Sequence, residues 1–166
     1  MTAFDTFSGS GPDFPGEAAL EHVRKVAPSF GGDPDRLIIT GESAGANLVT
    51  ALTLATVTPR PEPWARAAWE TGVTPRAVIP ACGMLQVSDP ERFFRRKPRL
   101  APFLRDRLHE VSEAYLGGAS GNLELADPLV LIEQGARFER PLPPFFVAVG
   151  TRDPLLDDSR RLKAAL

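Results

Sequence analysis

A strand-like run that leads through a glycine-bounded turn into an apolar helix constrains this chain more than any other feature. Residues 37–40 are Leu-Ile-Ile-Thr, a short apolar run rich in β-branched side chains, which predicts a buried strand. Residues 47–55 are apolar on nearly all sides, which is typical of a helix buried in a protein core. The turn between them carries Gly-Glu-Ser-Ala-Gly at 41–45, so the unit is a strand, a tight turn and a helix.

Two further apolar runs repeat this pattern. Residues 77–82 and 145–150 predict strands, and the second run is followed by a turn and a helix that starts near Leu156. Strands separated by helices imply a parallel sheet, because parallel strands need crossover connections. The chain is therefore predicted to be an α/β protein with a parallel sheet flanked by helices. Three strands would leave two exposed sheet edges, through which an oligomer or a complementing chain could pair.

The remaining segments differ in character. Residues 1–16 are rich in Gly, Ser, Pro and Asp and are expected to form an irregular lead-in, followed by an amphipathic helix over 17–27. Residues 83–127 are more charged and aromatic, and they contain a predicted helix at 101–115. We expect this stretch to be a lid-like insertion within one partial domain that spans 1–166.

Composition excludes several classes of protein. The net charge of −2 and the pI of about 5.7 provide no overall attraction to nucleic acid. The single Cys82 cannot form an internal disulfide, and one cysteine with two histidines is too few for a usual zinc site. No stretch reaches the roughly 18 apolar residues of a membrane span. We therefore expect a cytoplasmic protein without metal, membrane span or nucleic-acid partner.

The glycine-bounded turn is also the strongest chemical signal, because it has the spacing G-x-S-x-G. A serine on such a strained turn exposes its hydroxyl, and flanking glycines avoid Cβ clashes between the strand and the helix. The N–H of Ala44, at the start of the helix, is placed to donate to a developing oxyanion. Ser43 is the candidate nucleophile, and the rest of the turn is Gly41, Glu42 and Gly45. The alternative is a glycine-rich turn with a solvated serine.

Two longer segments resemble the hormone-sensitive-lipase-like esterases of the α/β-hydrolase fold. They are GGDPDRLIITGESAGANL at 31–48 and PPFFVAVGTRDPLLDDSRRL at 143–162. The resemblance implies a carboxylic-ester hydrolase that acts on small-molecule esters without a cofactor. It also implies that Ser43 is the nucleophile and that Asp153 orients the catalytic histidine. GESAG occurs in the larger type-B carboxylesterases too, but the DPLLDD segment favours the lipase-like group.

The position of Asp153 supports two roles. It follows the strand predicted to end at Gly150, so it is expected at the same carboxyl edge of the sheet as Ser43, where open α/β sheets bind their ligands. An aspartate before a proline at the start of a helix is also an ordinary N-cap. Both roles remain open.

Two features of the resembled family have no counterpart in these 166 residues: an H-G-G oxyanion segment before the serine and a histidine beyond the aspartate. His22 and His109 are expected to be structural or solvated. We therefore expect a fragment of a hydrolase domain that is nearly inactive by itself, since a serine without a general base is a poor nucleophile. The alternative is a non-catalytic truncated paralogue that acts as a binding or assembly partner.

Two smaller features have plain interpretations. Cys82 ends a predicted strand and is expected to be a small core residue. A group of basic side chains is flanked by acidic ones, so we expect a solvated helical face more than a site that guides an anion. The group comprises Arg92, Arg95, Arg96, Lys97, Arg99, Arg105 and Arg107.

Overall fold

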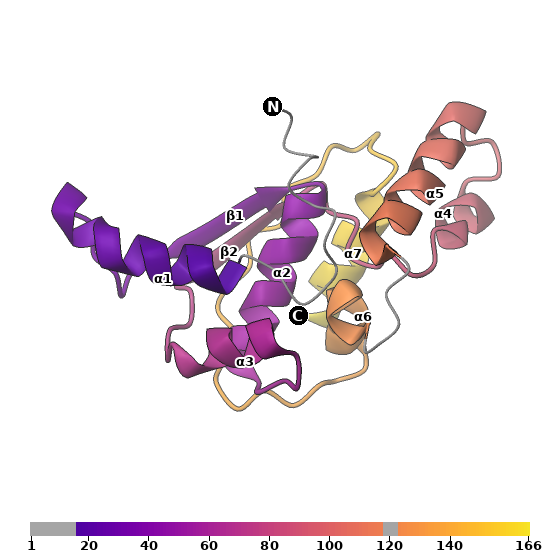
Figure 1. Ribbon diagram of the computed structural model, residues 1–166. Helices are drawn as coiled ribbons and strands as arrows, with labels where there is room; N and C mark the ends of the chain where they lie inside the picture. Colours follow the sequence, from indigo (N-terminus) through magenta and orange to yellow (C-terminus); the bar gives the residue numbers. More distant parts are fainter. Residues whose placement is uncertain (1–15, 118–122) are drawn as a thin grey trace.

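A small parallel sheet lies beside a set of helices in the computed structural model, which describes residues 16–117 and 123–166 (Figure 1). Strand β1 (Ile38–Glu42) pairs in parallel with β2 (Ala77–Ala81), and Ile39 lies opposite Val78. Both strands were predicted from their apolar runs. The expected lead-in at 1–16 falls outside the described residues except for Gly16, which begins the first helix.

The third predicted strand, at 145–150, is present only as two parallel bridges to β2. Phe145 bridges Val78, and Ala148 bridges Ala81. Phe146 N donates to the carbonyl of Val78, and Ala148 N donates to that of Pro80. Between these bonds the ladder has a gap because Pro80 has no N–H to donate. A proline within β2 therefore interrupts the pairing of the neighbouring segment.

The helices follow the predicted order, with additions. The predicted helices at 17–27, 47–55, 101–115 and near Leu156 are all present. Of the others, the helix at 63–70 was expected only as a helical turn at 64–69, and the short helices at 91–96 and 128–133 were not predicted. The full set is α1 (Gly16–Val26), α2 (Ala44–Val57), α3 (Pro63–Glu70), α4 (Glu91–Arg96), α5 (Pro102–Leu116), α6 (Pro128–Glu133) and α7 (Leu156–Ala165), with 3-10 turns η1 (Ala27–Phe30) and η2 (Glu124–Ala126).

The main core lies between one face of the sheet and the helices α2, α3, α6 and α7. Ile39, Phe145 and Val147 project from the sheet into this core. The opposite face is open among the described residues, because Ile38 is 61% exposed and Phe146 is 67% exposed. The prediction of buried strands at 37–40 and 145–150 was therefore wrong for the side chains on the open face. The helices of the described chain cover only one side, so inward and outward residues alternate.

Helix α2 is buried along most of its length, as its composition predicts. Three buried threonines fit the apolar surroundings because their hydroxyls donate to carbonyls one turn back in the same helix. Thr50 donates to Ala46 at 2.7 Å, and Thr53 donates to Val49 at 2.6 Å. None of the three threonine hydroxyls therefore needs a hydrogen-bond partner on the sheet, so α2 can pack closely against β1 and β2.

A second, smaller core joins α4 and α5 to the loop after β2. It is formed by the buried side chains Met84, Val87, Phe93, Phe94 and Leu108. In Figure 1 these two helices lie at the far side of α7 from the sheet. The elements lie within the predicted lid-like stretch at 83–127, of which 118–122 fall outside the described residues.

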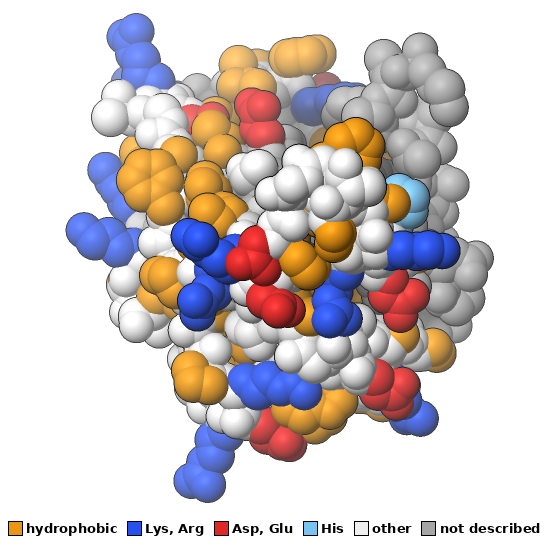
Figure 2. All heavy atoms as spheres, turned by 90° about the vertical axis from the view of Figure 1, so that its left-hand side faces the viewer, with side chains coloured by type: hydrophobic (Ala, Val, Ile, Leu, Met, Phe, Trp, Pro, Cys, Tyr) orange, Lys and Arg blue, Asp and Glu red, His pale blue; other side chains and the backbone are white. Residues whose placement is uncertain are grey.

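The surface shows no concentration of one charge on the face that Figure 2 presents, where basic and acidic side chains are interspersed with hydrophobic ones. This distribution agrees with the small net charge of −2. Within 16–117 and 123–166, no helix is both long enough and apolar enough to cross a membrane.

Candidate functional site

Ser43 lies at a sharply strained turn between β1 and α2. Its backbone angles are φ 55° and ψ −116°, a region that residues with a side chain rarely adopt. The turn is held from both sides: Ser43 N donates to the carbonyl of Ala81 at 3.0 Å, and its own carbonyl accepts from Ala46 N at 3.1 Å. The side chain is exposed. This is the conformation that the G-x-S-x-G spacing predicts for a nucleophile elbow.

The two glycines of the turn, Gly41 and Gly45, have different structural roles. A Cβ on Gly41 would lie only 2.1 Å from the carbonyl oxygen of Gly45, so the strand and the helix are too close for any side chain. A Cβ on Gly45 would meet no described atom within 4 Å. Both glycines were expected to relieve a clash between the strand and the helix. The structure assigns that requirement to Gly41, whereas Gly45 contributes the backbone that Gly41 approaches.

The start of α2 supplies backbone donors beside the serine. Helix α2 begins at Ala44, and the first N–H groups of a helix have no partner within it. These groups carry the positive end of the helix dipole. The turn therefore offers an exposed hydroxyl next to unpaired amide hydrogens, an arrangement suited to an anion that develops at a substrate carbonyl.

Asp153 lies in the turn after the third sheet segment and is half-buried. Its Oδ1 accepts a hydrogen bond from Leu155 N at 2.7 Å, and its own N–H donates to the carbonyl of Gly150 at 3.1 Å. Helix α7 begins at Leu156, and the residue at its N-cap position is Leu155. Asp153 thus organises the turn before α7 but is not the N-cap residue itself, which was the alternative role.

The sheet order relates Asp153 to Ser43. Ser43 follows β1, Cys82 follows β2, and Asp153 follows the segment that bridges β2 from its other side. All three strands run parallel, so these residues share the carboxyl edge of the sheet. The strands that lead to Ser43 and to Asp153 lie two strand spacings apart, about 10 Å in total.

Cys82 lies between these two residues and departs from its predicted role as a core residue. It is only partly buried and has a left-handed φ of 47°. Burial raises the pKa of its thiol above the ordinary value of 9.0, and the nearby carboxylates of Asp153 and Glu42 raise it further. A backbone hydrogen bond with Gly150 acts in the opposite direction and lowers this pKa. The thiol stays protonated at neutral pH and faces the Asp153 carboxylate.

Neither histidine lies at this edge. His22 is exposed on α1. His109, on α5, contacts Glu91 at 2.9 Å through Nε2 and stacks on the ring of Phe94 with centroids 5.4 Å apart. Both positions agree with the prediction that these histidines are structural or solvated.

Asn47 is a buried polar residue that the sequence analysis counted only as part of the apolar helix. It is 0% exposed, and its Nδ2 donates to the carbonyls of Met84 at 2.8 Å and Ala126 at 3.0 Å. Its Oδ1 accepts from the Tyr115 hydroxyl at 2.8 Å, and burial raises the pKa of that hydroxyl, which therefore remains a donor. Asn47 ties the helix that follows Ser43 to three distant segments. A lone asparagine in an apolar helix was the available signal.

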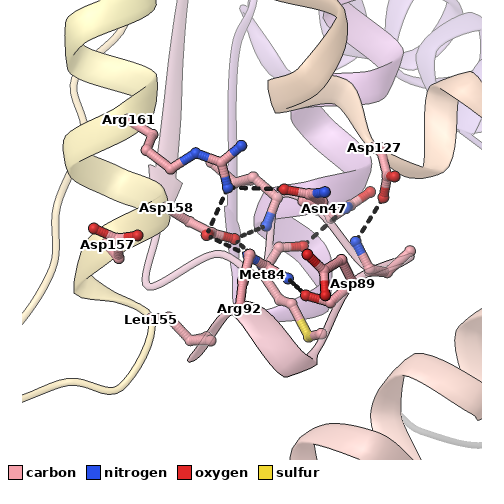
Figure 3. Close-up of polar contacts among 12 residues, drawn as sticks. Asn47, Met84, Asp89, Arg92, Asp127, Leu155, Asp157, Asp158 and Arg161 are labelled. Carbon is pink, nitrogen blue, oxygen red and sulfur yellow. Dashed lines mark hydrogen bonds and ion pairs between the residues drawn. The ribbon is translucent and has the colours of Figure 1, made fainter. Parts of the chain in front are cut away.

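A buried ion pair, also missed, joins α4 to α7 (Figure 3). Arg92 is 7% exposed and Asp158 is 0% exposed. Arg92 Nε donates to Asp158 Oδ1 at 3.1 Å, and Nη2 donates to Oδ2 at 2.6 Å. The basic group was expected to be a solvated face, and for Arg92 this was wrong. The reason is that its partner lies 66 residues away in the chain.

Other candidate sites are weaker. Within 16–117 and 123–166, no three metal-ligating side chains cluster. A groove of about 480 Å³ lies between α4 and α7, and its lining includes Pro154 and Asp157 but neither Ser43 nor Asp153. The carboxyl edge of the sheet is therefore the strongest candidate site of the described chain.

Comparison with known proteins agrees with this geometry. Residues 16–166 match the family described as the alpha/beta hydrolase fold. The chain is 32% identical over 150 residues to esterase LipQ of Mycobacterium tuberculosis (strain ATCC 25618 / H37Rv), covering 89% of this chain and 32% of that protein.

Solved structures show the same relationship. An esterase from the bacterial hormone-sensitive lipase family superimposes with a TM-score of 0.59 at 28% identity, covering 92% of this chain and 48% of that one. An esterase/lipase from an uncultured bacterium gives a TM-score of 0.59 at 27% identity, covering 92% and 46%. The chain thus spans about a third of the curated relative and about half of these structures. It belongs to the α/β-hydrolase fold family, and within it to the hormone-sensitive-lipase-like proteins.

Proposed function

We propose that the protein is a carboxylic-ester hydrolase that uses Ser43 as its nucleophile. The observation that carries the proposal is the backbone of Ser43, whose positive φ places an exposed hydroxyl between a strand and a helix. Such strain persists only where the surrounding structure enforces it, and it is concentrated at reactive sites. The names of the related proteins, an esterase and an esterase/lipase, support the same reaction class.

The proposed reaction is acyl transfer through the serine. Ser43 Oγ attacks the ester carbonyl carbon while its proton passes to a histidine, and the N–H of Ala44 donates to the oxyanion of the tetrahedral intermediate. The intermediate expels the alcohol, which takes the proton, and water then hydrolyses the acyl-serine. Asp153 is proposed to hold the histidine in one tautomer, since the strands that lead to Ser43 and Asp153 lie about 10 Å apart and leave room for an imidazole between their ends.

The general base is not among the described contacts of this chain. His22 is exposed on α1 and His109 is engaged with Glu91 and Phe94. We therefore propose that the 166-residue chain alone hydrolyses esters slowly, since a serine without a general base is a poor nucleophile. The non-catalytic alternative predicts no ester hydrolysis that depends on Ser43.

The test is hydrolysis of p-nitrophenyl acetate and butyrate by the protein at its natural length. Ser43→Ala is expected to lower kcat by about 10⁴-fold or more, and Asp153→Asn by about 10⁴-fold. Ser29→Ala and Asp106→Asn, exposed residues of the same types, serve as matched controls and are expected to retain the wild-type rate. Equal activity of Ser43→Ala and wild type would refute the proposed nucleophile.

A further inference from the structure

Three basic residues, two in α4 and one directly after it, contact the turn that carries Asp153 and the first residues of α7. Arg92 binds Asp158, Arg96 pairs with Asp157, and the ammonium of Lys97 donates to the Asp153 carbonyl at 3.3 Å. All three contacts fall within six residues of chain, at the start of α7. Helix α7, which follows the sheet edge, and helix α4, in the predicted lid-like stretch, are therefore joined next to Asp153, the proposed catalytic aspartate.

The Arg92 contact is the buried one of the three. Its guanidinium forms a two-bond fork on Asp158 and also donates through Nη1 to the carbonyl of Asp89 at 2.6 Å, so all three nitrogens are engaged. Asp158 Oδ2 accepts in addition from Leu85 N at 2.8 Å, in the loop after β2. Two hydrogen bonds between a planar guanidinium and a planar carboxylate fix the relative orientation of Arg92 and Asp158 as well as the distance between them.

A pair of this kind contributes little to stability in its own right. Burying both charges costs about as much as their attraction returns, and apolar residues of similar size would often stabilise a core as well. What the pair does provide is a unique relative position of α4, α7 and the loop after β2. Asp158 N also donates to the Leu155 carbonyl at 3.1 Å, which joins the fork directly to the Asp153 turn.

We propose that Arg92, acting through Asp158, is a positioning residue that holds Asp153 in its productive orientation toward the catalytic histidine. Rotation of α7 would move Asp153, because the helix begins three residues after it. Displacing a catalytic group by about 1 Å can lower a rate about 100-fold. The proposal rests on the proposed ester hydrolase and extends it to a residue that does not touch the substrate.

The test uses the protein at its natural length with p-nitrophenyl butyrate as substrate. Arg92→Met is expected to lower kcat by about 10- to 100-fold while KM changes by less than about twofold, because the substrate is still bound but the histidine is poorly oriented. The acid limb of the kcat/KM profile is expected to move to lower pH, since a misplaced Asp153 stabilises the imidazolium less. The other charged groups near this turn are unchanged in the variant, as is the Cys82 thiol that faces Asp153; these groups are Glu42, Arg96, Lys97, Asp157 and Arg161.

Two controls separate positioning from stability. Arg95→Met removes an exposed arginine from the same helix and is expected to leave kcat within about twofold. Leu108→Ala opens the small core under α4 and is expected to lower the unfolding midpoint without moving the acid limb. The proposal is overturned if Arg92→Met loses no more kcat than Leu108→Ala, or if its pH profile is unchanged.

A conservative variant covers the case in which Arg92→Met does not fold. Arg92→Lys keeps the charge and most of the volume but cannot form the fork, so it is expected to fold with a smaller loss of kcat in the same direction. Wild-type kcat in Arg92→Lys would overturn the proposal. Ser43→Ala in the same series reports separately on the proposed function: if wild type and Ser43→Ala are equally inactive, both proposals fail. If only the Arg92 variants behave as wild type, the positioning role alone fails.

Discussion

Replacing Gly41 by alanine tests the close contact beneath the Ser43 turn. The added Cβ would lie 2.1 Å from the Gly45 carbonyl oxygen, whereas ordinary contact begins at 3.4 Å, so the backbones must separate by about 1.3 Å. Because the opposing atom is backbone and not the end of a flexible side chain, we place the cost near the upper end of overpacking, about 3 kcal/mol. For a chain of this size that corresponds to a fall in Tm of about 6–12 °C.

The matched control is Gly45→Ala, four residues along the same turn. Its Cβ meets no described atom within 4 Å, and alanine is preferred over glycine in a helix by up to about 1 kcal/mol. The two variants make the same chemical change and are expected to shift stability in opposite directions. Urea unfolding followed by far-UV circular dichroism and by the fluorescence of Trp64 and Trp69 measures both midpoints. The claim that the close contact excludes a side chain at position 41 would be refuted if the unfolding midpoint of Gly41→Ala equalled that of wild type. It would also be refuted if both variants lowered the midpoint equally.

Two further outcomes are expected from buried polar groups. Tyr115→Phe leaves the buried Oδ1 of Asn47 without its donor and is expected to lower the free energy of unfolding by about 1–3 kcal/mol, as measured by urea unfolding; a change below about 0.5 kcal/mol would contradict this account of the Asn47 contacts. The raised pKa of Cys82 means that the folded chain holds its thiol proton to higher pH than the unfolded chain does, so its contribution to stability is complete below pH 9 and declines as the pH rises above that. Cys82→Ser is expected to remove this part of the alkaline decline, and iodoacetamide is expected to modify the folded thiol more slowly at pH 8 than it modifies the urea-unfolded thiol.

The parts of the fold predicted from sequence are those set by local pattern. The apolar run at 37–40, the glycines around Ser43 and the following apolar helix act within a single stretch of chain, so their structure follows from neighbours in sequence. Asp153 was picked out by the resemblance of the DPLLDD segment to the hormone-sensitive-lipase-like esterases, and its place after a predicted strand put it at the carboxyl edge of the sheet. The serine turn and the parallel character of the sheet could therefore be predicted from the sequence.

The features that sequence reasoning missed depend on partners far apart in the chain. Burial of a strand face depends on which helices cover it, so local composition overestimated the burial of Ile38 and Phe146. Asn47 and Arg92 resemble ordinary helix residues until their partners are known, and those partners lie up to 79 and 66 residues away. The gap opposite Pro80 likewise required knowledge of which segment pairs with β2.

The backbone of Ser43 also restricts how this turn can evolve. A single base change converts any serine codon into a threonine codon, and threonine carries the same hydroxyl. With φ at 55°, however, a β-branched side chain is a genuine outlier. Threonine, although a single base change away, is therefore sterically disfavoured at this position. Cysteine, which is unbranched at Cβ, fits the same backbone. The geometry of one residue thus makes cysteine, with its thiol, a more accessible replacement for this serine than threonine, the other amino acid with an aliphatic hydroxyl.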